Sequence, residues 1–464
     1  RGYALQSDGS CTCCASGATV WLALLATLVA MGYVISTSVR AVLEGDDAGE
    51  FSRVSAMVAK IGVNYVQMTA LLAGFDLDWG RSLRFAFSAL GAAGGAVVQA
   101  VALQCVVDVS YAQRALVGLV GVPLAVALGP GAVLLVLHCL RVRFLGRRVA
   151  AKYSRRSARL WRASSLVLVW LLYPTVAQEA FRVVYCVNVE GRRWLRADLR
   201  VACEGAEYDA VYALALVVIV GFVLGVPLAL FVAMHRRRDA IRRASEGEEG
   251  GGSARDRASA SSYRFLFEPY APRFFGWEAL IMLRKAALVA VLSFVPAEQG
   301  DLRVYIGLGV LQIPLLLQAF YRPFRTALQN RLESFALIAT FLTLFVGQAI
   351  SLEILPKPEQ QGGAAGEDAV DGELSKNVAL ALVTLVNAGV VLVMAGVVGA
   401  AWRRHVRAAF PEESDGVACL YGLVACCCGE RVAATATKAG DNDFFAGEEA
   451  EEGCGAADDS DDGD

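Results

Sequence analysis

The chain has 464 residues, of which 56% are hydrophobic and only 19% charged, and its formal net charge is −2. This balance excludes a soluble globular protein, because such a chain would separate its buried cores with polar loops. Instead, apolar residues come in blocks of about 20, the length that crosses a ~30 Å hydrocarbon layer as a helix. We therefore predict an all-α fold, a polytopic membrane helix bundle. We expect this bundle to be embedded in a lipid bilayer and to have no nucleic-acid partner.

The chain begins with a short segment, residues 1–16, that contains Cys11, Cys13 and Cys14. Its sequence, RGYALQSDGSCTCCAS, is typical of the end of a cysteine-rich extracellular module. The apolar block that follows is long enough to span the membrane, so it does not read as a cleavable signal peptide.

A transmembrane domain is predicted over residues 17–402, with about nine spans and one amphipathic inner helix. The spans are expected at 17–38, 84–108, 114–140, 164–186, 209–234, 277–296, 303–320, 333–355 and 377–402. In the amphipathic segment, 54–75, apolar residues follow helical spacing and Lys60, Asn64 and Gln67 lie opposite them. This helix either crosses the membrane in contact with a polar interior or lies flat at the interface.

Basic residues predict the orientation, because they favour the cytoplasmic side. They gather in four places: between Arg141 and Arg162, in HRRRDAIRR from residue 235, from Arg322 to Arg331, and from Arg403 to Arg407. Each cluster is two spans from the next, so we place all four inside, with a cytoplasmic linker over 235–276 and a cytoplasmic C-terminus. The N-terminus is then outside if 54–75 does not cross, and the early cysteines favour that side.

Two cysteines, Cys186 and Cys203, bracket the outer loop CVNVEGRRWLRADLRVAC. A disulfide that closes a loop of this size contributes about 3 kcal/mol to stability. The alternative is two free thiols near the interface.

Polar groups inside spans are costly in lipid, which makes them candidates for function. Glu179 and Arg182 lie three residues apart on one helix face and can pair. The other candidates of this kind are Glu278, Arg284, Lys285, Gln312 and Asn387. Three spans also contain a proline, at Pro123, Pro227 and Pro314, each of which frees a backbone carbonyl that a neighbour or water must satisfy. Two of these prolines share the pentapeptide GVPLA, through duplication or coincidence.

The stretch YRFLFEPYAPRFFGWEALIMLRK, residues 263–285, leads from the linker into a span. Its aromatic rings are expected at the inner interface, where such rings prefer to lie. Glu278 begins the helix, and Lys285 is two turns deeper. Either Lys285 extends back to the interface, or Arg284 or Lys285 meets a carboxylate on another helix. For Lys285, position favours Glu278 or Glu333 as the partner, and Glu179 and Asp108 lie further out.

The C-terminal segment, 403–464, is an acidic tail of low complexity and is expected to be disordered. Three adjacent cysteines, Cys426, Cys427 and Cys428, are candidates for palmitoylation, and the alternative is an unmodified hydrophobic tail. No motif of a catalytic, cofactor or metal site occurs in the sequence, so we expect neither an enzyme nor a cofactor.

Several pieces of the chain, taken together, resemble the TRP-like (transient receptor potential-like) membrane domain of algal and protist multipass proteins. They are KIGVNYVQMTALLAGFDLDW from Lys60, the dipeptide YP at Tyr173, WLRADLRVAC, GVPL at Gly225 and the stretch from Tyr263 to Lys285. That family often carries this domain after an EGF-like or ephrin-receptor-like ectodomain. The resemblance covers residues 17–402 and implies a cation-conducting or sensory membrane protein, which would be a homo-oligomer if it is a channel.

The segment before the last span, PKPEQQGGAAGEDAVDGELSK, has no hydrophobic pore helix and no filter-like motif. Its acidic residues either attract cations to an outer mouth or belong to a solvated loop. These are Glu359, Glu367, Asp368, Asp371 and Glu373. Three functions stay open: a cation channel or sensor, a transporter or carrier with its site among the broken helices, and a non-conducting receptor.

Overall fold

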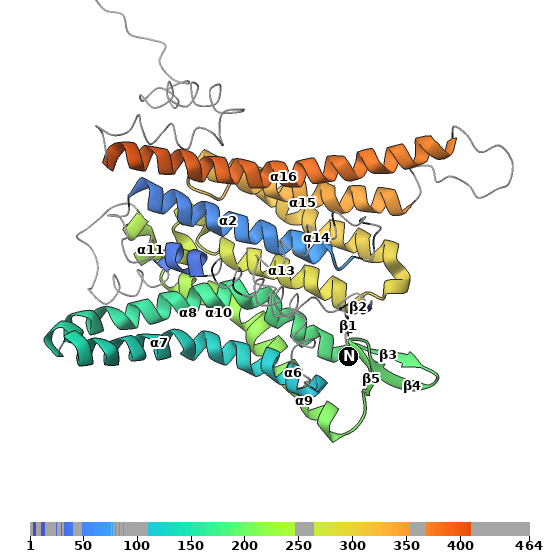
Figure 1. Cartoon of the computed structure of the whole chain (residues 1–464), viewed down its shortest axis with the longest axis horizontal. Coiled ribbons are helices and arrows are strands. Elements are labelled where there is room, and N and C mark those ends of the chain that lie inside the picture. The colour runs from blue at the N-terminus through green and yellow to red at the C-terminus, as the bar shows by residue number, and fades with distance from the viewer. Residues whose placement is uncertain are drawn as a thin grey trace, which may run out of the picture. The chain divides into compact units, whose positions relative to one another are not determined.

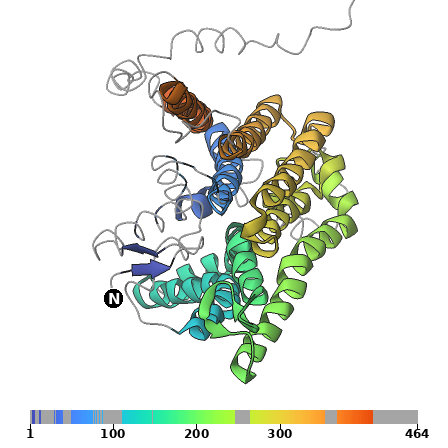
Figure 2. The same cartoon turned by 90° about the vertical axis from the view of Figure 1, so that its right-hand side faces the viewer.

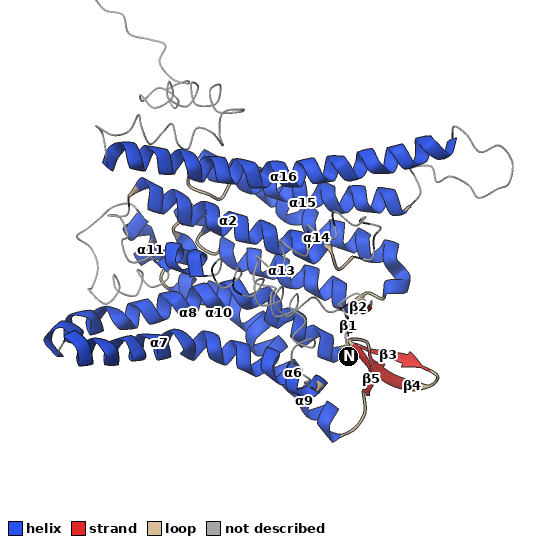
Figure 3. Ribbon diagram, in the orientation of Figure 1, coloured by secondary structure: helices blue, strands red, loops and turns tan. Residues whose placement is uncertain are grey.

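The computed structural model describes part of the chain. The described residues are 3–5, 11–13, 25, 29, 32–39, 49–75, 77, 79, 83, 87, 110–145, 147–245, 264–352 and 368–409. They form a mostly helical protein, in agreement with the predicted class (Figure 3). The chain divides into two compact units, Arg1–Ala401 and Trp402–Asp464, and the helix bundle lies in the first.

The bundle is built mainly from long helices (Figure 1). The long helices are α2 (Glu50–Leu72), α7 (Val122–Leu145), α8 (Arg147–Val184), α13 (Trp277–Phe294), α14 (Gly300–Tyr321), α15 (Ala327–Ser351) and α16 (Asp368–Ala409). The shorter ones are α6 (Tyr111–Leu116), α9 (Ala206–Val218), α10 (Gly225–Arg236) and α11 (Arg238–Ser245). Two π-helical turns, η2 (Val117–Gly121) and η3 (Ile219–Leu224), make α6 continuous with α7 and α9 with α10.

Six stretches among the described residues are long and apolar enough to cross a membrane, so the chain is an integral membrane protein. They are Tyr111–Phe144, Leu160–Val184, Ala206–Arg236, Gly300–Tyr321, Ala327–Ser351 and Asn377–Ala408. The predicted count of nine is not confirmed. Helix α13 has 18 residues but carries three charges, at Glu278, Arg284 and Lys285. The predicted spans 17–38 and 84–108 lie largely outside the described residues.

Two of the predicted loops are helical. Helices α7 and α8 are separated only by residue 146, so the basic segment 141–162 is not a loop but the ends of a long helical hairpin. The 38 residues of α8 extend for about 57 Å, well beyond the hydrocarbon thickness. Helix α16 begins at Asp368, so Asp368, Asp371 and Glu373 lie on its first turns rather than in a solvated loop.

Small β-sheets, which the all-α prediction omitted, accompany the helices. Strands β1 (Tyr3–Leu5) and β2 (Cys11–Cys13) pair antiparallel. Strands β3 (Cys186–Val189), β4 (Arg192–Leu195) and β5 (Asp198–Ala202) form a three-stranded antiparallel sheet between α8 and α9. A disulfide joins Cys186 to Cys203 across this sheet, as predicted. We call the end of the bundle that carries this sheet the sheet end, and the opposite end, where α7 meets α8, the basic end (Figure 1).

The amphipathic segment, α2, lies inside the bundle rather than flat on its surface. It packs beside α15 and α13 (Figure 2). Most of its residues from Val58 to Leu72 are buried. Residues Phe75 and Trp79, which follow it, pack against α14 and α15. A Cβ on Gly307 would lie 2.6 Å from the Phe75 ring, so only glycine accepts this packing without a shift.

The direction of α2 follows from its contacts. Along α2, Lys60 meets Glu278 and Gln67 meets Lys285, so α2 runs parallel to α13. It runs antiparallel to α16, because Gly62 lies beside Met394 and Tyr65 beside Asn387. Helix α13 runs from the basic end to the sheet end, and α2 therefore does the same (Figure 1).

Both copies of GVPLA follow a π-helical turn. Gly121 ends η2 and Gly225 begins α10 directly after η3, and in each case the proline stands two residues later. A proline cannot donate the helical hydrogen bond to the carbonyl four residues earlier, which favours such a local widening of the helix. For Pro227 that carbonyl belongs to Val223, and the hydroxyl of Tyr173 on α8 donates a hydrogen bond to it at 2.7 Å. For Pro227, a neighbouring side chain therefore satisfies the carbonyl that the proline leaves free, as predicted.

Candidate functional site: a buried polar cluster around Glu278

The centre of the cluster is the carboxylate of Glu278, in the first turn of α13. It is fully buried and has three partners from three different parts of the chain. The Lys60 ammonium on α2 lies 2.6 Å from Oε2, and the Tyr270 hydroxyl donates to the same oxygen at 2.8 Å. The Trp170 indole of α8 donates to Oε1 at 2.7 Å. A buried carboxylate needs such compensation to remain charged.

Lys60 occupies a cage made by the segment that precedes α13. Its ammonium donates to the Phe265 carbonyl at 2.8 Å and lies 4.4 Å from the centre of the Phe265 ring and 5.3 Å from that of Tyr270. Cation–π contacts of this kind strengthen when water is excluded. Phe265, Phe267 and Tyr270 are buried. These three rings therefore line the core rather than the membrane interface, where we expected them.

The segment that carries these rings is also attached to the turn between α14 and α15. Tyr270 and Phe324 form an antiparallel bridge, and their rings lie 4.9 Å apart. Arg325 donates to the Tyr270 carbonyl at 3.0 Å. The end of the linker therefore connects Lys60 and Glu278 to the start of α15.

Lys285 is fully buried and does not extend back to the interface. Its ammonium donates to Gln67 Oε1 at 2.7 Å and lies 4.9 Å from the centre of the Trp170 ring. The expected partners, Glu278 and Glu333, form their ion pairs with other residues, so that expectation was wrong. Gln67 in turn donates to the Leu171 carbonyl at 2.8 Å, in the turn that precedes Pro174. Lys285 is thereby connected to the proline-interrupted part of α8.

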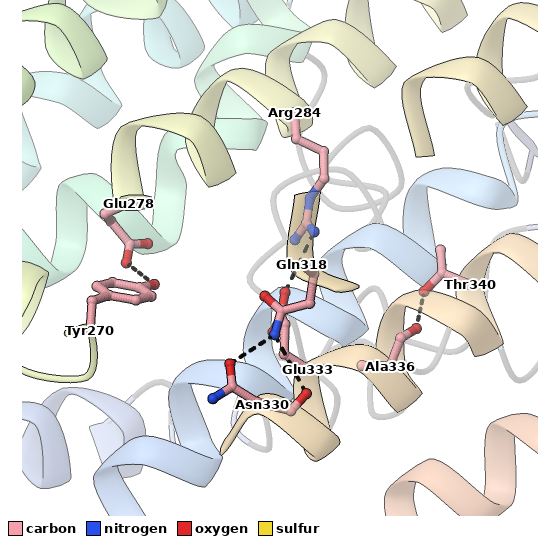
Figure 4. Close-up of polar contacts among 8 residues, drawn as sticks. All are labelled: Tyr270, Glu278, Arg284, Gln318, Asn330, Glu333, Ala336 and Thr340. Carbon is pink, nitrogen blue, oxygen red and sulfur yellow. Dashed lines mark hydrogen bonds and ion pairs between the residues drawn. The ribbon is translucent and has the colours of Figure 1, made fainter. Parts of the chain in front are cut away.

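Arg284 meets a carboxylate on another helix, which was one of the two alternatives for the Arg284–Lys285 pair of residues. Its Nη1 lies 3.5 Å from Glu333 Oε1 of α15, and both side chains are almost completely buried (Figure 4). The helices α2, α8, α13 and α15 are therefore joined by one group of buried polar contacts. Its ionisable members are three basic side chains, Lys60, Arg284 and Lys285, and two carboxylates, Glu278 and Glu333.

The excess of basic groups decides what the cluster can do. If all five groups are charged, the described cluster has a net charge of +1, which opposes the passage of a cation through it. Its partners are directional and lie on four helices, so any sliding of α13 against α2 or α8 breaks several of them. The arrangement suits a lock on helix positions better than an ion pathway.

Three other polar candidates, Asn387, Glu179 and Arg182, lie in two separate places. Asn387 of α16 accepts from Tyr65 at 2.5 Å and donates to Thr343 of α15 at 2.8 Å, which ties α16 to α2 and α15. Glu179 and Arg182 form the predicted pair, with 3.2 Å between Oε1 and Nη1. Gly118 in η2 allows Glu179 to approach, because a Cβ there would lie 3.0 Å from Glu179 Cγ.

Gln312 is exposed on α14, so the structure does not place this candidate in the polar interior. Cys426, Cys427 and Cys428 lie outside the described residues. Nothing in the sequence indicated Trp170 as a partner of Glu278. Lys60 and Gln67 were also absent from the site candidates, although the sequence carries a signal for them. Lys60, Asn64 and Gln67 form a polar stripe at i, i+4 and i+7 on an otherwise apolar helix, as expected of a helix that faces a polar interior.

Within the described part of the chain, no group of three or more His, Cys, Asp or Glu side chains is arranged to hold a metal ion. Similarity to known proteins gives no independent assignment. No protein-family model, curated protein or solved structure matches this chain.

Proposed function

We propose that this chain is a TRP-like membrane protein that conducts cations or senses a stimulus, and that the cluster around Glu278 holds its helices in one of two arrangements. The observation that carries this proposal is the burial of five ionisable side chains among α2, α8, α13 and α15. Such groups are expensive inside a membrane and are therefore retained for function. The resemblance of the stretches around Lys60 and Glu278 to the TRP-like domain supports the same assignment.

The cluster would act as a gate latch rather than as a filter. With all five groups charged, its net charge of +1 disfavours cations, so a conducting path would lie elsewhere, at an interface between copies of the chain. Gln312 supports such an interface, because a polar side chain on a face with Ile313 and Leu316 is costly against lipid and is relieved by a second subunit. The proposed assembly is a homo-oligomer with its N-terminus outside and its C-terminus in the cytoplasm.

A carrier is the second candidate, and the interrupted helices favour it. Pro174 lies inside α8, and two π-helical turns, η2 and η3, pack against this helix. Interrupted helices are common at the substrate sites of transporters. The third candidate, a non-conducting receptor, would use the same latch to transmit a signal from the outer segment to the inner tail.

Recording from the purified full chain in a planar bilayer separates these functions. The channel assignment predicts single-channel steps with cation selectivity, and Glu278→Gln should change the open probability while leaving the step size unchanged. Slow flux without steps would support the carrier. The absence of both, with a folded protein confirmed in the same bilayer, would leave the receptor.

A further inference from the structure

A small cavity lies between α13, α14 and α15, and Arg284 is part of its lining. It offers about 10 Å³ of space to a water-sized sphere. Its lining includes Ile281 and Arg284 of α13, Gln318 of α14, and Glu333 and Leu337 of α15. About 10–15 Å³ by this measure is the room that one water molecule needs.

Two buried polar atoms belong to side chains that line this cavity and lack a hydrogen-bond partner in the described protein. They are Nε of Arg284 and Oε1 of Gln318. Arg284 is 6% exposed and Gln318 is 1% exposed, so neither atom is satisfied by bulk solvent. Other atoms of the same side chains are engaged: Arg284 Nη1 with Glu333, and Gln318 Nε2 with Asn330 Oδ1 at 3.2 Å (Figure 4).

The two atoms are chemically complementary. Arg284 Nε–H is a donor, and Gln318 Oε1 is an acceptor. A single occupant that serves both must accept one hydrogen bond and donate another. A halide cannot donate, a metal cation is repelled by the guanidinium, and an ammonium ion cannot accept. Water meets both requirements and has the right size, whereas leaving both atoms unmatched would cost about 1–3 kcal/mol each.

We propose that this cavity is a site for one buried water molecule, which accepts from Arg284 Nε–H and donates to Gln318 Oε1. The water bridges α13 to α14 next to the Arg284–Glu333 pair, whose 3.5 Å separation is long for a direct charged hydrogen bond. The pair is thereby hydrated, and Gln318 becomes part of the polar group that joins α13 to α15. This site does not depend on whether the protein conducts ions.

X-ray hydroxyl-radical footprinting of the full chain in nanodiscs, with transfer into H₂¹⁸O, tests the site. A bound water forms radicals in place and labels the side chains beside it, so Ile281 and Leu337 should be labelled although both are buried. Incorporation of ¹⁸O at these residues should lag behind that at exposed side chains. Val289, buried on the same helix but away from the cavity, should stay unlabelled.

The Gln318→Leu variant removes the acceptor and should abolish the labelling of Ile281 and Leu337. Gln348→Leu is the matched control. Gln348 is also a buried glutamine, but it lies on α15 and does not line this cavity, so its replacement should leave the labelling of Ile281 and Leu337 unchanged. Unlabelled Ile281 and Leu337 in the wild type would overturn the proposal, and so would equal labelling in Gln318→Leu. If Gln318→Leu does not fold, the wild-type labelling and its ¹⁸O lag decide the question.

Discussion

Lys285 and Glu278 are both fully buried, yet their replacements should differ in cost. Lys285 has a neutral partner, Gln67, in a cluster with more basic side chains than carboxylates. Lys285→Met keeps most of the side-chain volume and removes one unpaired cation, so we expect a loss of at most about 1–2 kcal/mol in the free energy of unfolding. Glu278→Gln leaves Lys60 without its counter-ion and should cost about 3–5 kcal/mol.

Unfolding by SDS titration of both variants in mixed micelles measures this difference. An equal cost for Lys285→Met and Glu278→Gln would show that Lys285 shares the Glu278 carboxylate, contrary to the contacts described above.

Tyr173 and Pro227 form a second residue-scale pair, because the tyrosine hydroxyl serves the carbonyl that the proline leaves free. Tyr173→Phe should destabilise the protein by about 1–3 kcal/mol, the cost of a buried unsatisfied carbonyl. In a Pro227→Ala background the new backbone N–H can serve Val223, so the same substitution should cost less. A double-mutant cycle measures the difference, and equal costs in the two backgrounds would show that the hydroxyl is not needed for this carbonyl.

At the scale of elements, the sheet between α8 and α9 depends on its disulfide. Cys186→Ala or Cys203→Ala should lower the free energy of unfolding by about 3 kcal/mol and release one thiol that alkylating reagents can reach. Cys139→Ala is the control, because Cys139 is a free cysteine: its removal should leave the free energy of unfolding unchanged and should release no new thiol. Two alkylatable thiols at 186 and 203 in the untreated protein would contradict the bridge.

The sequence predicted the helices well where apolar periodicity alone decides, as in α14 and α15, and it predicted the disulfide from two bracketing cysteines. Charged residues favour a loop over a membrane span, which is why the sequence predicts loops where α7, α8 and α16 continue. A helix that extends beyond the hydrocarbon layer accepts such residues. The partner of Lys285 could not be predicted. Whether Lys285 meets Gln67 or Glu278 depends on how far α2 is shifted along α13 in the folded protein. The local sequence of neither helix determines that shift.

At the scale of the whole molecule, the direction of α2 changes how the spans are counted. Helix α2 runs from the basic end to the sheet end, so if it crosses the membrane it adds one crossing to the six that length and composition identify among the described residues. The predicted orientation has the basic end inside and the N-terminus outside. Impermeant thiol reagents applied to a cysteine at Ser154 should react only from the inside, and at Ser7 only from the outside.

Labelling of either position from the opposite side would contradict this topology. The six other crossings recognised by length and composition do not depend on the result, because they rest on the described helices alone. A cysteine at Ser351, at the end of α15, provides a control that should react from the same side as Ser7.

The central claim is that α2 is a helix of the bundle, held there by the pair of Lys60 with Glu278. The most direct test is a double-mutant cycle with Lys60→Met and Glu278→Gln, followed by the free energy of unfolding in mixed micelles. We expect each single variant to lose about 3–5 kcal/mol and the double variant to lose clearly less than the sum, since it leaves no unpaired charge at this site. Strictly additive losses would contradict the account, because they would mean that the two side chains do not meet.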